Sequence, residues 1–164
     1  MLSIFRQVLD VPYTHTERGG SYYRKRLGSR LSIFFEKSNG CGDWRDNLDF
    51  PAVPYRQMQE TWYCHRGFLT VWKDIQPYLE EEILNRQVNS ILIAGYSHGG
   101  AIAQLCYEFC RYHRPDCKLE GYSFGSPRVV FGKLPKSVND RFCGFVMIKN
   151  RGDIVTHLPL RFLG

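Results

Sequence analysis

The sequence predicts an α/β fold in which a mostly parallel sheet carries helices on both faces. Short apolar runs bounded by turn residues alternate with segments of helical spacing, as in strand–helix–strand units. The run over residues 90–94 is apolar at almost every position, which is typical of a strand buried on both faces of a parallel sheet. The 164 residues, 43% apolar and 23% charged, suit one globular domain with its own core.

The predicted elements follow one another in an order that suits such a sheet. They are a hairpin of strands over 21–26 and 30–35, an irregular connection over 39–54, a helix from 67 to about 85, a strand over 90–94, a helix over 100–113, and strands over 118–124 and 142–149. The connection is rich in Gly, Asp, Asn and Pro, and a long loop in a compact domain is often functional. Pro77 is expected to kink or split the first helix, and Pro115 to end the second.

The chain is basic, and a basic balance can favour a nucleic acid or an anionic lipid surface. Basic residues exceed acidic ones, for a net charge of +6, and they are densest at Arg24, Lys25, Arg26 and Arg30. No nucleic-acid-binding motif accompanies this cluster. We therefore interpret the cluster as a solvated strand edge, where Lys and Arg guard against aggregation, and we expect no nucleic acid to bind.

The cysteines and the apolar runs narrow the class of protein further. The set Cys106, Cys110, His113 and Cys117 contains no C-x-x-C pair, which zinc sites usually have, so we expect no metal. The six cysteines of the chain are expected to be free thiols. No apolar run approaches the roughly twenty residues of a membrane-spanning helix. The first residues lack the pattern of a signal peptide, so a cytoplasmic location is the default expectation.

The segment that follows the buried strand contains the candidate catalytic residue. Residues 95–99, Gly-Tyr-Ser-His-Gly, form a G-x-S-x-G pattern between a strand and a helix, which is the context of a nucleophile elbow. The sharp turn strains the backbone of Ser97 and aims its hydroxyl out of the sheet, while Gly95 and Gly99 let strand and helix approach closely. The helix N-terminus adds partial positive charge, and the NH of His98 can donate to a developing oxyanion. We predict that Ser97 is a catalytic nucleophile.

A nucleophilic serine needs a base and an acid that orients the base. In folds with this elbow the acid follows the serine along the chain. Asp153 comes after the apolar stretch 145–148, at a carboxyl end of the predicted sheet, where catalytic residues collect. Asp153 is therefore the candidate acid; the alternative is an ordinary turn residue in Arg-Gly-Asp-Ile.

These residues belong to a longer resemblance to the class 3 lipase family, the fungal-type triacylglycerol lipases within the α/β-hydrolases. The resemblance runs from about Leu31 to Pro159 and rests on motifs in the family's order. They are Leu-Ser-Ile-Phe-Phe-Glu-Lys-Ser over 31–38, Asp-Trp-Arg-Asp-Asn-Leu-Asp-Phe over 43–50, Cys-His-Arg-Gly-Phe over 64–68, the elbow over 95–101, Tyr-Ser-Phe-Gly-Ser-Pro-Arg-Val over 122–129, and Asn-Arg-Gly-Asp-Ile-Val-Thr-His-Leu-Pro over 150–159. The resemblance implies one α/β-hydrolase domain over 1–164.

The resemblance also implies roles for residues outside the elbow. Ser38 falls on the Ser or Thr that supplies an oxyanion-hole donor, beside the NH of His98. Trp44 falls in the lid segment and would cover or open the acyl pocket. Asp153 falls on the acid of the catalytic triad, and His65 falls in a motif that the family uses for packing near a helix start.

The sequence departs from the family pattern at two places. Glu36 and Lys37 stand where the family has Arg-Gly, directly before Ser38. The family's catalytic His comes after the Leu-Pro, and residues 160–164 contain no His. The most economical interpretation is that the chain stops short of the last strand and of this His. Two alternatives are that His157, four residues after Asp153, is the base, and that a natural truncation has lost turnover.

The predicted function is that of a serine carboxyl-ester hydrolase, lipase-like, that takes part in lipid metabolism. Its substrate would be an ester or lipid, with peripheral contact with a lipid surface, and its mechanism requires no cofactor and no metal. The alternative is a non-catalytic domain that binds a lipid or a partner on a hydrolase scaffold, because fold does not imply function. Thioesterase and acyltransferase chemistry use the same kind of elbow.

Overall fold

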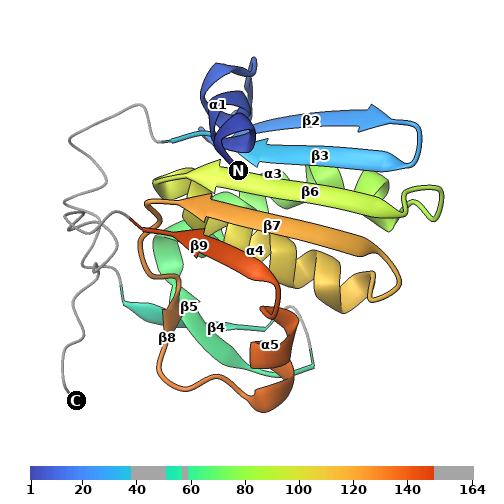
Figure 1. The fold of residues 1–164 in the computed structure, drawn as a ribbon. Helices are drawn as coiled ribbons and strands as arrows, with labels where there is room; N and C mark the ends of the chain where they lie inside the picture. Colours follow the sequence, from blue (N-terminus) through green and yellow to red (C-terminus); the bar gives the residue numbers. More distant parts are fainter. Residues whose placement is uncertain (38–50, 57–58, 150–164) are drawn as a thin grey trace.

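A computed structural model describes residues 1–37, 51–56 and 59–149 (Figure 1). Its helices are α1 (Leu2–Asp10), α3 (Arg66–Leu84), α4 (His98–His113) and α5 (Lys136–Arg141). Its strands are β1 (Thr14–His15), β2 (Ser21–Leu27), β3 (Arg30–Phe35), β4 (Ala52–Tyr55), β5 (Trp62–His65), β6 (Ser90–Tyr96), β7 (Lys118–Phe124), β8 (Val130–Phe131) and β9 (Phe145–Ile148).

The larger sheet has the strand order β1-β2-β3-β6-β7-β9. Strands β1, β2 and β3 pair antiparallel, as the predicted hairpin requires, whereas β3, β6, β7 and β9 run parallel. Phe35 pairs with Gly95, and Gly95 pairs with Ser123, so β3, β6 and β7 end side by side at one edge of the sheet (Figure 1). Ligand and catalytic sites of such sheets form at this carboxyl edge.

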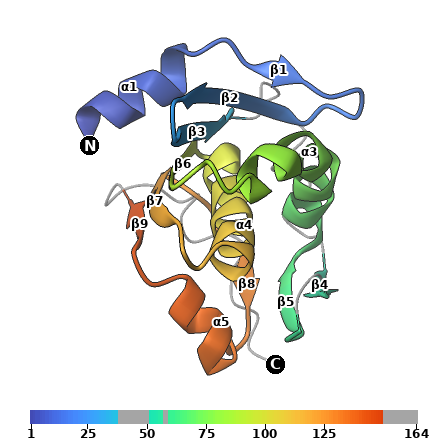
Figure 2. The ribbon, with the colours of Figure 1, turned by 90° about the vertical axis from the view of Figure 1, so that its right-hand side faces the viewer.

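Helices cover both faces of this sheet, as predicted. Successive side chains of β6 point to opposite faces. Ile91 and Ile93 join the core beneath α3 and α4, whereas Leu92 and Ala94 join a smaller core with Val8 of α1. Figure 2 shows α1 on one side of the sheet and α3 and α4 on the other. Burial on both faces is the physical reason for the nearly unbroken apolar run in β6.

A smaller antiparallel sheet, in the order β4-β5-β8, was not predicted. The rings of Tyr55 and Trp62 pack with their centroids 4.5 Å apart, and both side chains belong to the core of α3 and α4. Arg141, at the end of α5, donates hydrogen bonds to Glu108 of α4 at 2.7 Å and to Glu60 at 3.0 Å. This charged cluster ties α5 to α4 and to the segment that leads into β5.

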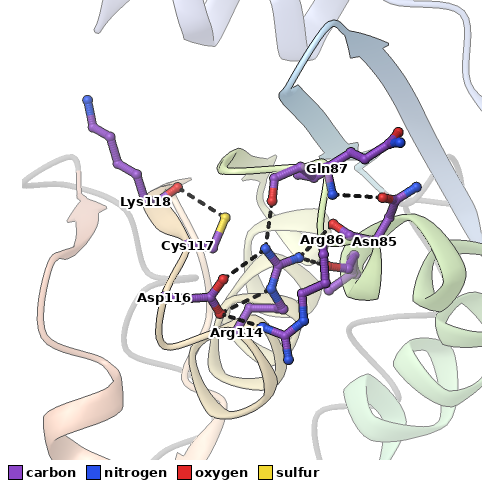
Figure 3. Close-up of polar contacts among 9 residues, drawn as sticks. Asn85, Arg86, Gln87, Arg114, Asp116, Cys117 and Lys118 are labelled. Carbon is purple, nitrogen blue, oxygen red and sulfur yellow. Dashed lines mark hydrogen bonds and ion pairs between the residues drawn. The ribbon is translucent and has the colours of Figure 1, made fainter.

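Arg114 fastens the ends of α3 and α4 to each other (Figure 3). Its guanidinium is 1% exposed and donates to the carbonyl oxygens of Ile83 at 2.7 Å, Asn85 at 2.9 Å and Val88 at 2.6 Å. Asp116 accepts two further hydrogen bonds from it, each 3.2 Å long. The last carbonyls of a helix have no intrahelical donor, so the buried arginine supplies the donors that this end of α3 needs.

Helix α3 is one continuous helix with Pro77 inside it, so the prediction that Pro77 could split the helix is wrong. A proline in a helix interior costs about 3 kcal/mol because it removes a hydrogen bond and crowds the preceding turn. Trp72, Ile75 and Leu79, on both sides of Pro77, are fully buried. Burial of an apolar side chain is worth about 1.5–3 kcal/mol each, which outweighs the penalty.

The strand predicted over residues 142–149 is shorter in the structure. β9 covers only Phe145–Ile148, and the short helix α5 precedes it. Phe142 follows the last residue of α5 and packs edge-on against Trp62, with ring centroids 6.1 Å apart. Phe142, the apolar residue that suggested a longer strand, therefore packs against the core next to the small sheet.

Three members of the basic cluster, Arg24, Lys25 and Arg26, lie on a strand edge, as predicted, whereas Arg30 begins the interior strand β3. Among the residues that the structure describes, β1 pairs with β2 only at Ser21 and Tyr22, and Arg24 and Lys25 beyond that point are exposed. The described cysteines are free thiols, as expected; they are Cys64, Cys106, Cys110, Cys117 and Cys143. No helix within the described ranges combines the length and the apolar content that crossing a membrane would need.

Candidate active site

Ser97 occupies the turn between β6 and α4, as predicted. Strand β6 ends at Tyr96, and α4 begins at His98. The backbone of Ser97 has φ 52° and ψ −120°, and no other non-glycine residue in the described part of the chain has a positive φ. Side chains rarely occupy this region, and such strain persists mainly at functional sites. The residue is half-buried, so solvent reaches the turn.

The glycines of the elbow are required by close backbone contacts. A Cβ atom on Gly95 would lie 2.1 Å from the carbonyl oxygen of Gly99, and one on Gly99 would lie 2.2 Å from the carbonyl oxygen of Phe35. Both distances are far below van der Waals contact, and the obstructing atoms are backbone, which cannot turn aside. The strand end of β3 and the first turn of α4 are therefore packed against each other through Gly99.

Two backbone hydrogen bonds fix the turn itself. The NH of Ser97 donates to the carbonyl oxygen of Phe124 at 2.8 Å, and the NH of Gly100 donates to the carbonyl oxygen of Ser97 at 2.9 Å. The elbow is thus tied to the end of β7 as well as to its own helix. His98 and Gly99 are the first residues of α4, where helix geometry leaves amide groups without intrahelical acceptors. Such amides, with the helix dipole, suit a developing negative charge.

The His98 side chain is neutral at neutral pH. Burial, followed by the nearby His65, lowers the pKa of His98 to about 4. Its ring makes an edge contact with Phe68, with centroids 5.3 Å apart. Because the imidazole is uncharged, it adds no positive charge to the elbow, and the role of the His98 backbone NH as an oxyanion donor stays a prediction.

His65 has a structural role at the start of α3, in agreement with the packing role expected for it. Its Nδ1 accepts a hydrogen bond from the NH of Gly67 at 3.1 Å, which caps the helix. Its ring lies 4.4 Å from that of Phe68, between centroids. Burial lowers the pKa of His65, with a smaller contribution from Arg66.

The other predicted site residues lie outside the described residues. Ser38, Trp44, Asp153 and His157 all fall in the ranges 38–50 and 150–164. The segment that directly precedes Ser38 nevertheless lies close to the elbow. A Cβ atom on Gly99 would lie 2.5 Å from the carbonyl oxygen of Glu36, two residues before Ser38.

Two pockets lie against α4, one at its start and one further along the helix. The first, of about 240 Å³, is lined by His15, Gly19, Ser21, Glu36, Lys37, Val71, His98 and Ile102. The second, of about 260 Å³, is mostly apolar and is lined by Gln104, Ser126, Pro127, Arg128, Val129, Val130, Leu134, Asn139, Phe142, Phe145, Met147 and Lys149. The first contains the residue next to Ser97, so it adjoins the elbow directly.

His15 and Glu36 were not predicted from the sequence to lie near the elbow. His15 Nδ1 lies 2.7 Å from the hydroxyl oxygen of Ser21 and 3.9 Å from Oε2 of Glu36. The pairing of β1 with β2, and of β2 with β3, brings these residues together. The only signal in the sequence was the replacement of the family's Arg by Glu36. Among the described residues, no group of three His, Cys, Asp or Glu side chains is arranged to hold a metal ion.

Solved lipase structures share this fold. The triacylglyceride lipase of Rhizomucor miehei is 24% identical and superposes with a TM-score of 0.76, covering 94% of this chain and 62% of that one. A lipase from Rhizopus microsporus var. chinensis is 21% identical, with a TM-score of 0.71 over 94% of this chain and 58% of its own. Lipase II from Rhizopus niveus is 20% identical, with a TM-score of 0.72 over 91% of this chain and 60% of its own. The chain spans about 60% of the length of these lipases.

The family relation itself comes from the sequence match. No curated protein matches the chain. Residues 32–163 match the family described as Lipase (class 3), and this range includes the elbow and every predicted site residue. The mostly parallel sheet, the strained serine between β6 and α4, and this match over most of the chain agree with one another. The chain belongs to the class 3 lipase family.

Proposed function

We propose that the protein hydrolyses carboxyl esters, with lipids as its substrate class and Ser97 as its nucleophile. The observation that carries the proposal is the backbone of Ser97, held at φ 52° between a buried parallel strand and a helix N-terminus. This is the conformation that lifts a nucleophile out of a sheet. Membership of the lipase family supports the proposal, as does a similar structure described as a triacylglycerol lipase whose catalytic centre is a serine protease triad.

In the proposed mechanism the Ser97 hydroxyl attacks the ester carbonyl while a histidine takes its proton. Asp153 orients that histidine and stabilises its charged form. The NH of His98 and Ser38 donate hydrogen bonds to the oxyanion of the tetrahedral intermediate. Loss of one such donor typically costs about 10²–10³ in rate. The alcohol then leaves, and water releases the acid from the acyl-enzyme by the same route.

The proposal includes a cover over the acyl site. Trp44 would pack on the acyl chain of the substrate, because an aromatic ring buries a large apolar area. Peripheral contact with a lipid surface fits this picture, since one similar structure, a fungal lipase–inhibitor complex, is described as a model for interfacial activation. The change Trp44→Ala should therefore weaken octanoate esters more than acetate esters. Equal losses on both would make Trp44 a structural residue.

The experiment that tests the function is hydrolysis of a series of nitrophenyl esters by the natural protein. We expect turnover that varies with acyl-chain length and that falls by at least about 10³ in kcat/KM in Ser97→Ala. Ser90→Ala, at the other end of the same strand, is the matched control and should retain activity. Absence of turnover on every ester, with the fold intact, would favour the alternative of a lipid- or partner-binding domain.

A further inference from the structure

The outer edge of β2 is open over most of its length. Its neighbour on that side is β1, which is two residues long and pairs only with Ser21 and Tyr22. Residues 23–27 pair with β3 on their other side, and no described strand lies beyond them (Figure 1). The hairpin turn ends this edge at the start of β3, whereas the elbow follows the end of the parallel strand β6. The open edge therefore lies at the end of the sheet away from Ser97.

The hydrogen bonds around Gly20 show which backbone groups face the open side. Gly20, directly before β2, donates its NH to the Thr16 hydroxyl at 2.7 Å and accepts the Thr16 NH at 2.8 Å, so both of its groups point to the β1 side. Backbone groups of successive residues in a strand alternate between its two edges. Arg24 and Arg26, four and six positions after Gly20, therefore turn their NH and carbonyl groups to the same side. Within the described residues these groups have no backbone partner on that side.

Three consecutive cations, Arg24, Lys25 and Arg26, lie along this edge. The Arg24 guanidinium donates to the carbonyl oxygen of Tyr78, and that of Arg26 donates to Oε1 of Gln87 at 2.9 Å. Both acceptors are uncharged. In the part of the chain that the structure describes, none of the three cations pairs with a carboxylate. The open edge thus combines unpaired backbone groups with positive charge that the described residues do not neutralise.

We propose that the open edge of β2 binds an extended acidic segment of a partner protein, which pairs with residues 23–27 as an additional strand. In this mode of recognition the backbone hydrogen bonds supply affinity and the side chains supply specificity. A second copy of this chain is the wrong partner, because pairing β2 with β2 would bring like charges together, which is destabilising. The same cations that guard the edge against self-association therefore select an acidic strand.

The alternation of side chains in β2 defines the pattern of the acidic segment. Tyr22 faces α3, where its ring stacks on Tyr78 with centroids 5.9 Å apart. Because the side chains of a strand alternate, Arg24 and Arg26 share that face and Lys25 points to the other. A paired strand places one residue opposite each of these cations, within reach of an opposite charge. The segment should therefore carry three consecutive acidic residues, flanked by residues that favour a strand.

Two peptides of equal charge test the proposal by NMR titration of the natural protein. The first is acetyl-Thr-Val-Glu-Glu-Glu-Val-Thr-amide, and the second has the same sequence with its glutamates N-methylated, which prevents the backbone hydrogen bonds. We expect the first to shift the amide signals of residues 23–27 and to bind at least about tenfold more tightly than the second, because it keeps the strand pairing. Equal affinity of the two peptides would overturn the proposal, because charge alone would then explain their binding.

Charge reversal provides the second test. Arg24→Glu with Arg26→Glu should remove binding of the glutamate peptide and create binding of its counterpart with Lys-Glu-Lys at the centre, which also shows that the variant folds. Lys73→Glu with Lys133→Glu changes the same charge at exposed positions elsewhere and should bind as the natural protein does. Equal loss in this control, or binding of phosphatidylserine vesicles through the two arginines with no response to either peptide, would overturn the proposal. Hydrolysis of nitrophenyl esters should be the same in all these variants, so this inference and the proposed function fail separately.

Discussion

The strained backbone of Ser97 leads to a prediction about stability. A side chain in this region of φ and ψ costs about 1–3 kcal/mol, and glycine avoids that cost but loses about 0.5–1 kcal/mol of backbone entropy on folding. Ser97→Gly should therefore raise the free energy of unfolding by about 1 kcal/mol, measured by urea denaturation, and remove activity. Ser97→Ala is the control: it removes the hydroxyl and keeps the Cβ. Equal stability of the two variants would show that the turn is not strained.

The pKa of His98 leads to a prediction about acid stability. The pKa lies at about 4 in the folded protein, below the ordinary value of 6.5. Between these pH values the unfolded chain binds a proton that the folded protein does not, so His98 lowers stability as the pH falls from 6.5 to 4. His98→Gln should flatten the pH dependence of the unfolding free energy in that window. An unchanged slope would mean that His98 is accessible to protons in the fold.

The site residues differ in how far the sequence could predict them. Ser97 was predictable because its glycines, its strand and its helix are neighbours along the chain. The roles of Ser38 and Trp44 came from the family resemblance, and that of Asp153 came also from its place after a strand; all three remain predictions. His15 and Glu36 could not be paired in advance, because only the pairing of β1, β2 and β3 brings them to 3.9 Å.

At the scale of elements, Arg114 leads to a prediction about the joint between α3 and α4 (Figure 3). Its buried guanidinium donates to three carbonyl oxygens and pairs with Asp116. Arg114→Met should lower the free energy of unfolding by about 3 kcal/mol, because those carbonyls would stay buried without donors. Arg86, whose side chain is 75% exposed, pairs with the same Asp116 and provides the control.

The Arg86→Met control should cost less than about 1 kcal/mol, as is usual for an exposed ion pair. Chemical denaturation of both variants under the same conditions gives the comparison. If the two variants lost the same stability, Arg114 would be acting through Asp116 alone, and the capping role assigned to its guanidinium would be wrong.

The elements that the sequence predicted best are those whose burial follows from local pattern. Strand β7 has the predicted bounds, and β6 extends the predicted run by two residues. Helices cover both faces of β6, and its apolar run reflects that burial. The helix α1 and the small sheet of β4, β5 and β8 were missed. The strands of the small sheet are only two to four residues long. The sheet is stabilised by contacts such as that between Tyr55 and Trp62, which no hydrophobic periodicity in the sequence reveals.

At the scale of the whole molecule, the unassigned member of the proposed triad is the base. We expect His157→Ala in the natural protein to retain most of its esterase activity. His157 comes only four positions after Asp153, so the two side chains would have to fold back on each other within one turn. A loss as large as that of Ser97→Ala, in a variant that still folds, would instead identify His157 as the base.

The central claim is that Ser97 is an activated nucleophile, and covalent labelling tests it most directly. The natural protein should react with an alkyl fluorophosphonate, and mass spectrometry of its peptides should find one adduct, on Ser97. Ser97→Ala should take up no label and hydrolyse no ester, whereas Ser90→Ala should behave as the natural protein. Ester hydrolysis that persists in Ser97→Ala, or a label on another residue, would contradict the account.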